Sequence, residues 1–485
     1  MSSSDTLIAA DLDLCYMSAT QQLALFKSGK LSPVDVLKAQ FARADEVEPK
    51  INAFTEMFRE EAMKAAIAAE ETYAKRPDKA RALEGITVAI KDEMAVLGQR
   101  NTQGSLIYKD YIADETHPVA ERLRNAGAIF HARSATPEFC CAWTTESRLH
   151  GVTRNPWALD YTPSGSSGGA AAALAAGTTT LATGSDIGGS IRGPAGACGI
   201  VGFKPPYGRV PDAAPFNLDP YCHVGAMART TADCALMQNV ISGFHPQDIA
   251  TVREKMVLPL TFGDLKGKRI AYSFDVSNEV VTPEVEAQMT KALSALVDAG
   301  ASIEEVQLGW GKEVRDGCRN YLSHLMGAAL RREVEAHPDL VCDYTAFCAE
   351  SAGMTTADDF LTALDVAADI YSRFGPMMEN DYYAFICPTF ASQEMLAEQK
   401  PWDRITVQGR DFDSDYDLNT QAVFNMLSRL PTLAVPAGLA TNGRPVGIQI
   451  VARAFDDPRV FHVASALERA MPWLDCKARR PDLSA

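Results

Sequence analysis

The sequence predicts an α/β fold in which a sheet lies between two layers of helices, and three observations support this. Short β-prone runs alternate with amphipathic helical patterns from about residue 80 onward. Apolar residues make up 47% and charged residues 22% of the 485-residue chain, which is typical of a globular protein with a substantial core. No Pro-, Gly- or Ser-rich linker separates the blocks. We therefore expect one large domain over residues 1–485.

Residues 1–75 are predicted to form an N-terminal helical arm. Apolar residues recur three and four positions apart between Thr20 and Ala74. Ser32 followed by Pro33 is typical of a helix cap with proline at the first helical position. The segment is thus expected to form a helical arm or layer.

The α/β alternation starts in a predicted catalytic core at 80–240. The strands expected along the chain are 86–90, 128–131, 178–183, 269–272, 433–435 and 445–451. The helices expected beside them are 117–127, 170–176, 283–300 and 460–470. The stretch from about 316 to 415 is the least patterned, so we expect a variable region there that shapes the substrate site.

Composition also limits the function. The formal net charge of −16, without Lys/Arg-rich runs, argues against a nucleic-acid partner. We recognise no secretory signal and no run of roughly 20 apolar residues that would span a membrane, so a cytoplasmic location is expected. The eleven cysteines and eight histidines lack metal-ligand spacing. We expect free thiols, no metal and no cofactor. The sequence does not decide the oligomeric state, and a homodimer is one alternative.

Two loops rich in glycine and serine carry the functional signal. The first, 162–169, leads into an alanine-rich helix that Gly177 ends. After a β-prone run comes the second loop, 184–192. Small residues let other backbone approach closely, and loops of one sheet can meet side by side. The two loops are therefore expected to form one site.

Three other interpretations of the loops compete. In the first they are plain flexible turns, but two such dense loops around regular elements argue against this. A phosphate cradle would need GxxxxGK[ST], or GxGxxG after a strand with a later acidic residue, and neither occurs. Residues 165–169 fit the GxSxG nucleophile elbow with Ser167 as nucleophile. That elbow follows a buried strand, and 154–163, which contains two prolines, does not resemble one.

The two loops resemble the signature of the amidase signature family. The stretches that carry the resemblance are 165–169, 184–192 with Pro194, 88–92, 136–139, 202–205, 207–209 and 445–449. Lys91 stands 75 residues before Ser166, and Ser166 stands 24 residues before Ser190, as in the family. The resemblance implies a large, mixed, twisted sheet sandwiched between helices and a serine hydrolase that cleaves C–N acyl bonds through an acyl-enzyme.

The resemblance also implies a catalytic role for three residues. Ser190 is the nucleophile, Ser166 is the bridging serine on a cis peptide after Gly165, and Lys91 is the base. A serine hydroxyl attacks poorly until a neighbour takes its proton, and a lysine takes a proton only when neutral. The apolar run 86–90 predicts that Lys91 is buried, which disfavours the ammonium form. Ser166 then relays the proton and later returns it to the leaving amine.

The second loop predicts an oxyanion hole and supporting residues. Glycines in this loop should leave consecutive backbone N–H groups free to converge on a negative oxygen. These N–H groups belong to Ile187, Gly188, Gly189 and Ser190. Ser167 is expected to accept a hydrogen bond from Lys91, while Asp186 and Arg192 are expected to hold the two loops in place.

The substrate is less closely predicted. The candidate apolar walls of the site are Phe139, Trp143, Tyr207 and Met227. They suit a small uncharged amide or carbamate, as in aryl acylamidases and urethanases. The family also includes the glutaminase subunit of a transfer-RNA amidotransferase, but 318–350 does not resemble that subunit, so an independent enzyme is favoured. A catalytically silent scaffold and a metal-dependent hydrolase are further alternatives, and the intact serine–lysine set argues against the scaffold.

Overall fold

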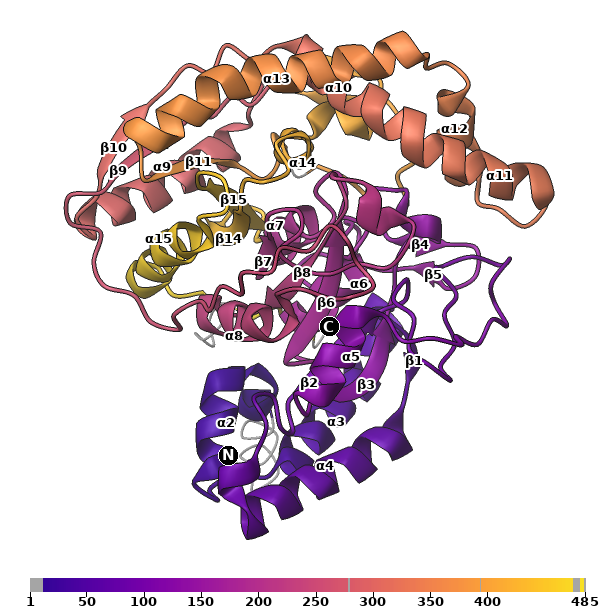
Figure 1. The fold of residues 1–485 in the computed structure, drawn as a ribbon, viewed down its shortest axis with the longest axis vertical. Coiled ribbons are helices and arrows are strands. Elements are labelled where there is room, and N and C mark those ends of the chain that lie inside the picture. Colours follow the sequence, from indigo (N-terminus) through magenta and orange to yellow (C-terminus); the bar gives the residue numbers. More distant parts are fainter. Residues whose placement is uncertain (1–11, 278–279, 393, 474–479, 484–485) are drawn as a thin grey trace.

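An eleven-stranded sheet forms the centre of the computed structural model, which describes residues 12–277, 280–392, 394–473 and 480–483 (Figure 1). In spatial order the strands are β1 (Phe54–Met57), β3 (Ile129–Ser134), β2 (Thr87–Lys91), β6 (Leu181–Asp186), β8 (His223–Ala228), β7 (Val201–Lys204), β14 (Thr432–Leu439), β15 (Pro445–Val451), β11 (Ala384–Pro388), β9 (Arg269–Tyr272) and β10 (Ser302–Glu305). Two small hairpins lie outside this sheet, β4 (Glu146–Ser147) with β5 (Gly151–Val152) and β12 (Ile405–Val407) with β13 (Arg410–Phe412).

The sheet mixes parallel and antiparallel neighbours. Strand β2 runs parallel to both β3 and β6, and β9 runs parallel to both β10 and β11. The remaining pairs are antiparallel. Because β2 and β6 are parallel neighbours, their carboxyl ends lie at the same edge of the sheet.

Helices flank the sheet and bury its apolar residues. Helices α6 (Gly168–Ala176) and α7 (Arg192–Cys198) pack against each other and against the sheet. A second group packs on the sheet and on one another: α5 (Pro118–Asn125), α8 (Thr231–Ile241), α9 (Pro283–Asp298) and α15 (Asp457–Ala470). A mixed sheet flanked by helices confirms the predicted fold class. Every residue of α6 is buried, which explains why alanine and glycine, with small side chains, make up most of that helix.

The described part of the segment predicted as a helical arm is mostly helical and includes one strand. Its longer helices are α2 (Ala19–Lys27), α3 (Pro33–Ile51) and α4 (Arg59–Lys75). Ser32 caps α3 as expected, since its side chain accepts a hydrogen bond from the Val34 N–H. The helical pattern is interrupted at β1, a four-residue strand between α3 and α4 that pairs with the edge of β3.

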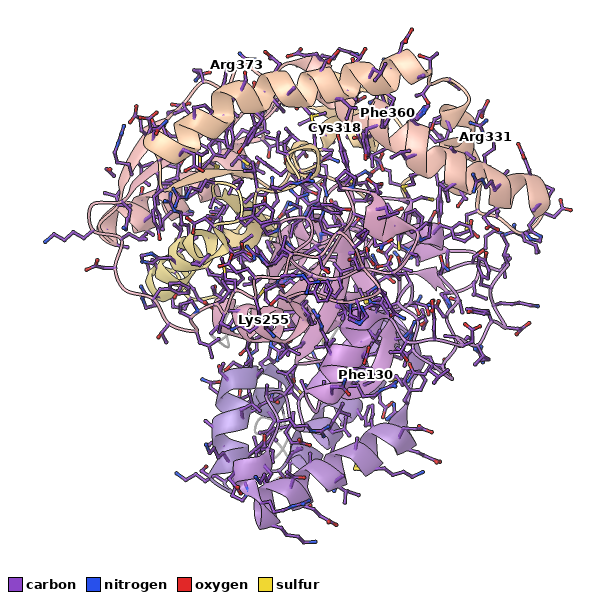
Figure 2. All side chains as sticks on the ribbon, viewed as in Figure 1. Phe130, Lys255, Cys318, Arg331, Phe360 and Arg373 are labelled. Atoms are coloured by element: carbon purple, nitrogen blue, oxygen red, sulfur yellow. The ribbon has the colours of Figure 1, made fainter. Side chains whose placement is uncertain are left out.

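A helical cap at 312–380 lies at the opposite end of the molecule from α2–α4 (Figure 1). It comprises α10 (Lys312–Leu322), a π-helical turn (Ser323–Gly327), α11 (Ala328–Ala336), α12 (Asp343–Ala352) and α13 (Ala357–Asn380). Figure 2 shows Arg373 on its outer face, and Cys318 is buried beneath it. The cap packs on a second apolar cluster that includes Phe374, Phe385 and Phe424, the last from the short helix α14 (Val423–Met426). The least patterned part of the sequence is therefore mostly regular helix.

None of the helices in the described ranges is long and apolar enough to cross a membrane.

Candidate active site

The site lies where the parallel strands β2 and β6 end. Lys91 is the last residue of β2, and Ser185 and Asp186 are the last two of β6. The loops that precede α6 and α7 meet at this same edge, and they carry Ser166 and Ser190. The carboxyl end of a parallel sheet is where α/β enzymes commonly bind their ligands. The two Gly/Ser loops therefore come together as the sequence predicts.

Lys91 is fully buried and surrounded by oxygen atoms. Its Nζ donates to Ser166 Oγ at 2.8 Å and to Ser185 Oγ at 2.7 Å. A third oxygen, Oε1 of Glu93, lies 3.3 Å from Nζ. The Lys91 amine therefore hydrogen bonds to two hydroxyls and lies at ion-pair distance from one carboxylate oxygen.

The Glu93 carboxylate is itself tied into the site. Its Oε2 accepts a hydrogen bond of 2.6 Å from the Cys140 thiol. Burial favours the neutral acid, but the charge of Lys91 and the hydrogen bond from Cys140 outweigh it, so the pKa of Glu93 lies below its usual value. Burial, together with this carboxylate, raises the pKa of Cys140 to about 12. At neutral pH, Glu93 is therefore an anion and Cys140 is a thiol donor.

Ser166 and Ser190 lie on adjoining loops. The Ser167 N–H donates to the Ser190 carbonyl at 3.1 Å, and the Gly165–Ser166 peptide is cis. Ser166, like Lys91, has no exposed surface, whereas Ser190 is 8% exposed. Within the described residues, the Ser190 hydroxyl makes no hydrogen bond. The structure thus joins Lys91 to Ser166 directly, while the contact from Ser166 to the Ser190 hydroxyl stays a prediction.

The loop before Ser190 is held by side chains from elsewhere in the chain. Asn419 donates to the Gly188 carbonyl at 3.0 Å, and the Gly189 N–H donates to Asp186 at 2.8 Å. The Gly189 N–H is therefore not free, which corrects one of the four predicted oxyanion donors. In the part of the chain that the structure describes, the N–H groups of Ile187, Gly188 and Ser190 have no protein acceptor.

Asp186 and Arg192 form a fully buried ion pair at 2.9 Å. The Arg192 guanidinium also donates to Gln449 and to Asn425, each at 2.6 Å. Burial alone would raise the pKa of Asp186, but the charge and hydrogen bonds of Arg192 hold it well below its usual range. Since Asp186 also accepts the Gly189 and Ile191 N–H groups, this pair fixes the loop that carries Ser190.

Comparison with known proteins identifies the family of this chain. A family model described as Amidase matches residues 35–461. The chain belongs to the amidase signature family. It is 34% identical to an acylamidase of Rhodococcus erythropolis, over 96% of this chain and 98% of the relative. It is 33% identical to a glutamyl-tRNA(Gln) amidotransferase subunit of Carboxydothermus hydrogenoformans, over 94% and 98% of the two chains.

Two solved structures superpose over nearly the whole chain. A bacterial aryl acylamidase of the family has a TM-score of 0.86 at 26% identity, covering 94% of this chain and 97% of that one. A 6-aminohexanoate cyclic dimer hydrolase has a TM-score of 0.82 at 27% identity, covering 97% and 99%.

Ser167 does not take the role that was predicted for it. Its hydroxyl lies 3.3 Å from the backbone N–H and the carbonyl of Ser185, and not beside Lys91. Ser185 supplies the second oxygen to Lys91 in its place. Ser167 therefore holds the backbone of Ser185, and the Ser185 hydroxyl in turn contacts Lys91.

The four predicted substrate walls separate into two groups. Met227 is wrong as a wall, because it is fully buried in the core on β8. Tyr207 packs beside His223, and its hydroxyl donates to the Asn217 carbonyl at 2.7 Å. Phe139 and Trp143 belong to the loop that carries Cys140, and both are partly exposed. Only these last two lie on the loop that reaches Glu93.

Trp143 and a residue of the cap flank the Gly188 position. A methyl group built on the Gly188 Cα would lie 3.5 Å from Leu322 Cδ1 and 4.0 Å from Trp143 Cζ2. Leu322 ends α10, so the cap contributes an apolar group at the predicted oxyanion loop. That the region at about 316–415 shapes the substrate site stays a prediction.

Four residues of the site were not predicted from the sequence: Ser185, Glu93, Cys140 and Leu322. Ser185 was placed in a loop because of its Gly-Ser neighbours, although it belongs to β6. Glu93 stands two residues after Lys91, a spacing at which side chains of extended backbone share a face. No local signal joins Cys140 to Glu93, 47 positions away.

Within the described ranges, no three His, Cys, Asp or Glu side chains are grouped to hold a metal ion.

Proposed function

We propose that this amidase signature protein is a serine hydrolase that cleaves the C–N bond of small uncharged amides. The observation that carries the proposal is the buried 2.8 Å contact between Lys91 Nζ and Ser166 Oγ, beside a Ser190 hydroxyl that remains accessible. A buried base next to a partly exposed alcohol is the arrangement that nucleophilic catalysis requires.

The proposed reaction moves one proton along the three residues. Neutral Lys91 takes the Ser166 proton while Ser166 takes the Ser190 proton, and Ser190 Oγ attacks the acyl carbon. The N–H groups of Ile187, Gly188 and Ser190 stabilise the oxyanion. The same relay in reverse protonates the leaving amine, which departs and leaves an acyl-enzyme. Water then attacks the ester, again through Lys91.

The residues around Gly188 support an apolar acyl group. Leu322 and Trp143 offer hydrocarbon surface and no charge at this point. The relatives named acylamidase and aryl acylamidase support the same class of substrate. Carbamates and esters present the same carbonyl to Ser190, so we include aryl carbamates as a second set of test compounds.

A glutaminase subunit is the second candidate, because the transfer-RNA amidotransferase relative is 33% identical to this chain. Free glutamine carries an ammonium and a carboxylate, which need charged partners, whereas acetanilide needs none. We expect kcat/KM for acetanilide to exceed that for free glutamine. The reverse order would favour the glutaminase.

Covalent labelling tests the chemistry without knowledge of the substrate. A fluorophosphonate probe should label the native protein and fail to label Ser190→Ala. Equal labelling of the two would eliminate Ser190 as the nucleophile. Failure to label the native protein, together with no turnover across amides, carbamates and esters, would support a silent scaffold. Loss of turnover on exhaustive chelation would favour the metal-dependent alternative.

A further inference from the structure

The proposed base has a carboxylate partner that the three-residue reaction does not use. Glu93 lies on the segment just after β2, and its side chain is 22% exposed, while that of Lys91 is fully buried. The 3.3 Å separation from Lys91 Nζ places an anion beside the group that must gain and lose a proton. A carboxylate at this distance stabilises the ammonium over the neutral amine.

The second oxygen of the Glu93 carboxylate contacts a thiol. Cys140 donates to Glu93 Oε2, and its own sulfur lies 3.1 Å from Thr136 Oγ1. Phe139 and Cys140 have left-handed backbone, with φ of 51° and 58°. Non-glycine residues adopt this conformation at a cost, and they do so mostly where the surroundings enforce it. The loop thus turns the thiol toward Glu93.

Other charged or titratable groups also face Glu93. Arg133, from β3, interacts electrostatically with both Glu93 and Glu56. Cys222, from the segment before β8, also interacts electrostatically with Glu93. Only Lys91 and Cys140 are within direct contact distance of the carboxylate oxygens among the described charged and thiol groups.

We propose that Glu93 is a positioning residue that sets how strongly Lys91 holds its proton, and that the Cys140 thiol tunes Glu93 by sharing its charge. The inference rests on the proposed role of Lys91 as base. When Ser190 attacks, the relayed proton turns Lys91 into an ammonium, and the Glu93 anion lies beside the charge that forms. Preorganised charge of this kind lowers the barrier, but a neighbouring anion also favours the charged form of an amine before the reaction begins.

The two effects predict a signature that a structural role would not produce. In Glu93→Gln, the acid limb of the kcat/KM profile should move to lower pH by about one unit or more, because the anion is lost. The plateau should fall by roughly tenfold to a hundredfold, because the developing ammonium loses its partner. Glu56→Gln removes the same charge from near Arg133 without touching Lys91, so its profile should match the native one.

Removing the Cys140 thiol should move the acid limb in the direction opposite to that expected for Glu93→Gln. Cys140→Ala removes a donor from Glu93, which makes the carboxylate a stronger base and should move the acid limb to higher pH. Cys140→Ser keeps a donor and should restore a limb close to the native position. These variants leave Glu93 in place, so they test the inference even if Glu93→Gln fails to fold.

The outcomes separate this inference from the proposed function. An unchanged acid limb in both Glu93→Gln and Cys140→Ala, with Lys91→Met inactive, would overturn the role of Glu93 and leave the base assignment intact. Full activity of Lys91→Met would instead overturn the proposed function. Opposite shifts in the two variants would support the inference, and thermal unfolding of each variant would show that the shifts do not come from misfolding.

Discussion

Lys91 and Lys204 are both fully buried, but the groups around them differ. Lys91, at the end of β2, contacts two serine hydroxyls and a carboxylate. Lys204, at the end of β7, donates to backbone carbonyls, of which Leu430 O is nearest at 3.0 Å, and its Nζ also lies 3.5 Å from Nε2 of the buried His223. Burial, and after it the charge of Arg192, lowers the pKa of Lys204 well below its usual value.

The difference shows that burial alone does not give a lysine a partner for proton transfer. A backbone carbonyl accepts a hydrogen bond but cannot give or take a proton, so Lys204 has no hydroxyl through which to pass one. Lys91 has a hydroxyl partner that can both donate and accept. The neighbours of the amine, and not its low exposure, therefore distinguish the site from the core.

The largest expected effect comes from removing each amine in turn. Lys91→Met should lower turnover of an aryl amide at least about a thousandfold, because the relay loses its proton acceptor. Lys204→Met should keep turnover within about tenfold of native, because no proton passes through that lysine. Steady-state kinetics at pH 8, with circular dichroism to verify folding, would measure both. Equal losses in the two variants would contradict the distinction.

The second effect concerns the ion pair that lies between the two lysines. Asp186→Asn leaves the Arg192 charge buried without its partner, which should cost about 3–5 kcal/mol of unfolding free energy. The same change frees the loop that carries Ser190, so turnover per folded molecule should also fall. Urea unfolding and kinetics would measure the two losses.

A matched control exists in the pair Arg209–Asp457, which is nearly as buried and lies apart from the Ser190 loop. Asp457→Asn should lower stability without changing turnover of the molecules that remain folded. If both variants lost stability alone, Asp186 would have no effect on the site beyond its contribution to the fold.

The elements that could be predicted from sequence are those whose signals are local. Arg269–Tyr272 and Pro445–Val451 are strands with the predicted bounds, because short apolar runs between turn residues fix both ends. Helix α9 begins at Pro283 after Thr282, as predicted, although the Thr282 side chain makes no capping hydrogen bond. Strand β1 was not predicted because its four residues are too few to interrupt the helical pattern of apolar residues around them. They form a strand because they pair with β3, which is distant in sequence.

The site could be predicted as far as its motifs reach. The spacing of Lys91 and Ser166 anticipated two residues that hydrogen bond across the fold. Ser185 and not Ser167 contacts Lys91, and this depends on which face of β6 the Ser185 side chain takes, which follows from strand register. The contact of Leu322 with the Gly188 position depends on how the cap docks, which no short pattern encodes.

The smallest expected effect is a pH slope, and it tests whether burial acts on Lys204 as described. The folded protein holds this amine neutral at a pH where the unfolded chain, with a lysine pKa of about 10.4, is protonated. The unfolded state therefore binds more protons, and stability rises with pH until about 10.4. One proton contributes at most about 1.4 kcal/mol per pH unit. Lys204→Met should remove this part of the slope between pH 7 and 10 in urea unfolding, and an unchanged slope would mean that Lys204 remains charged in the fold.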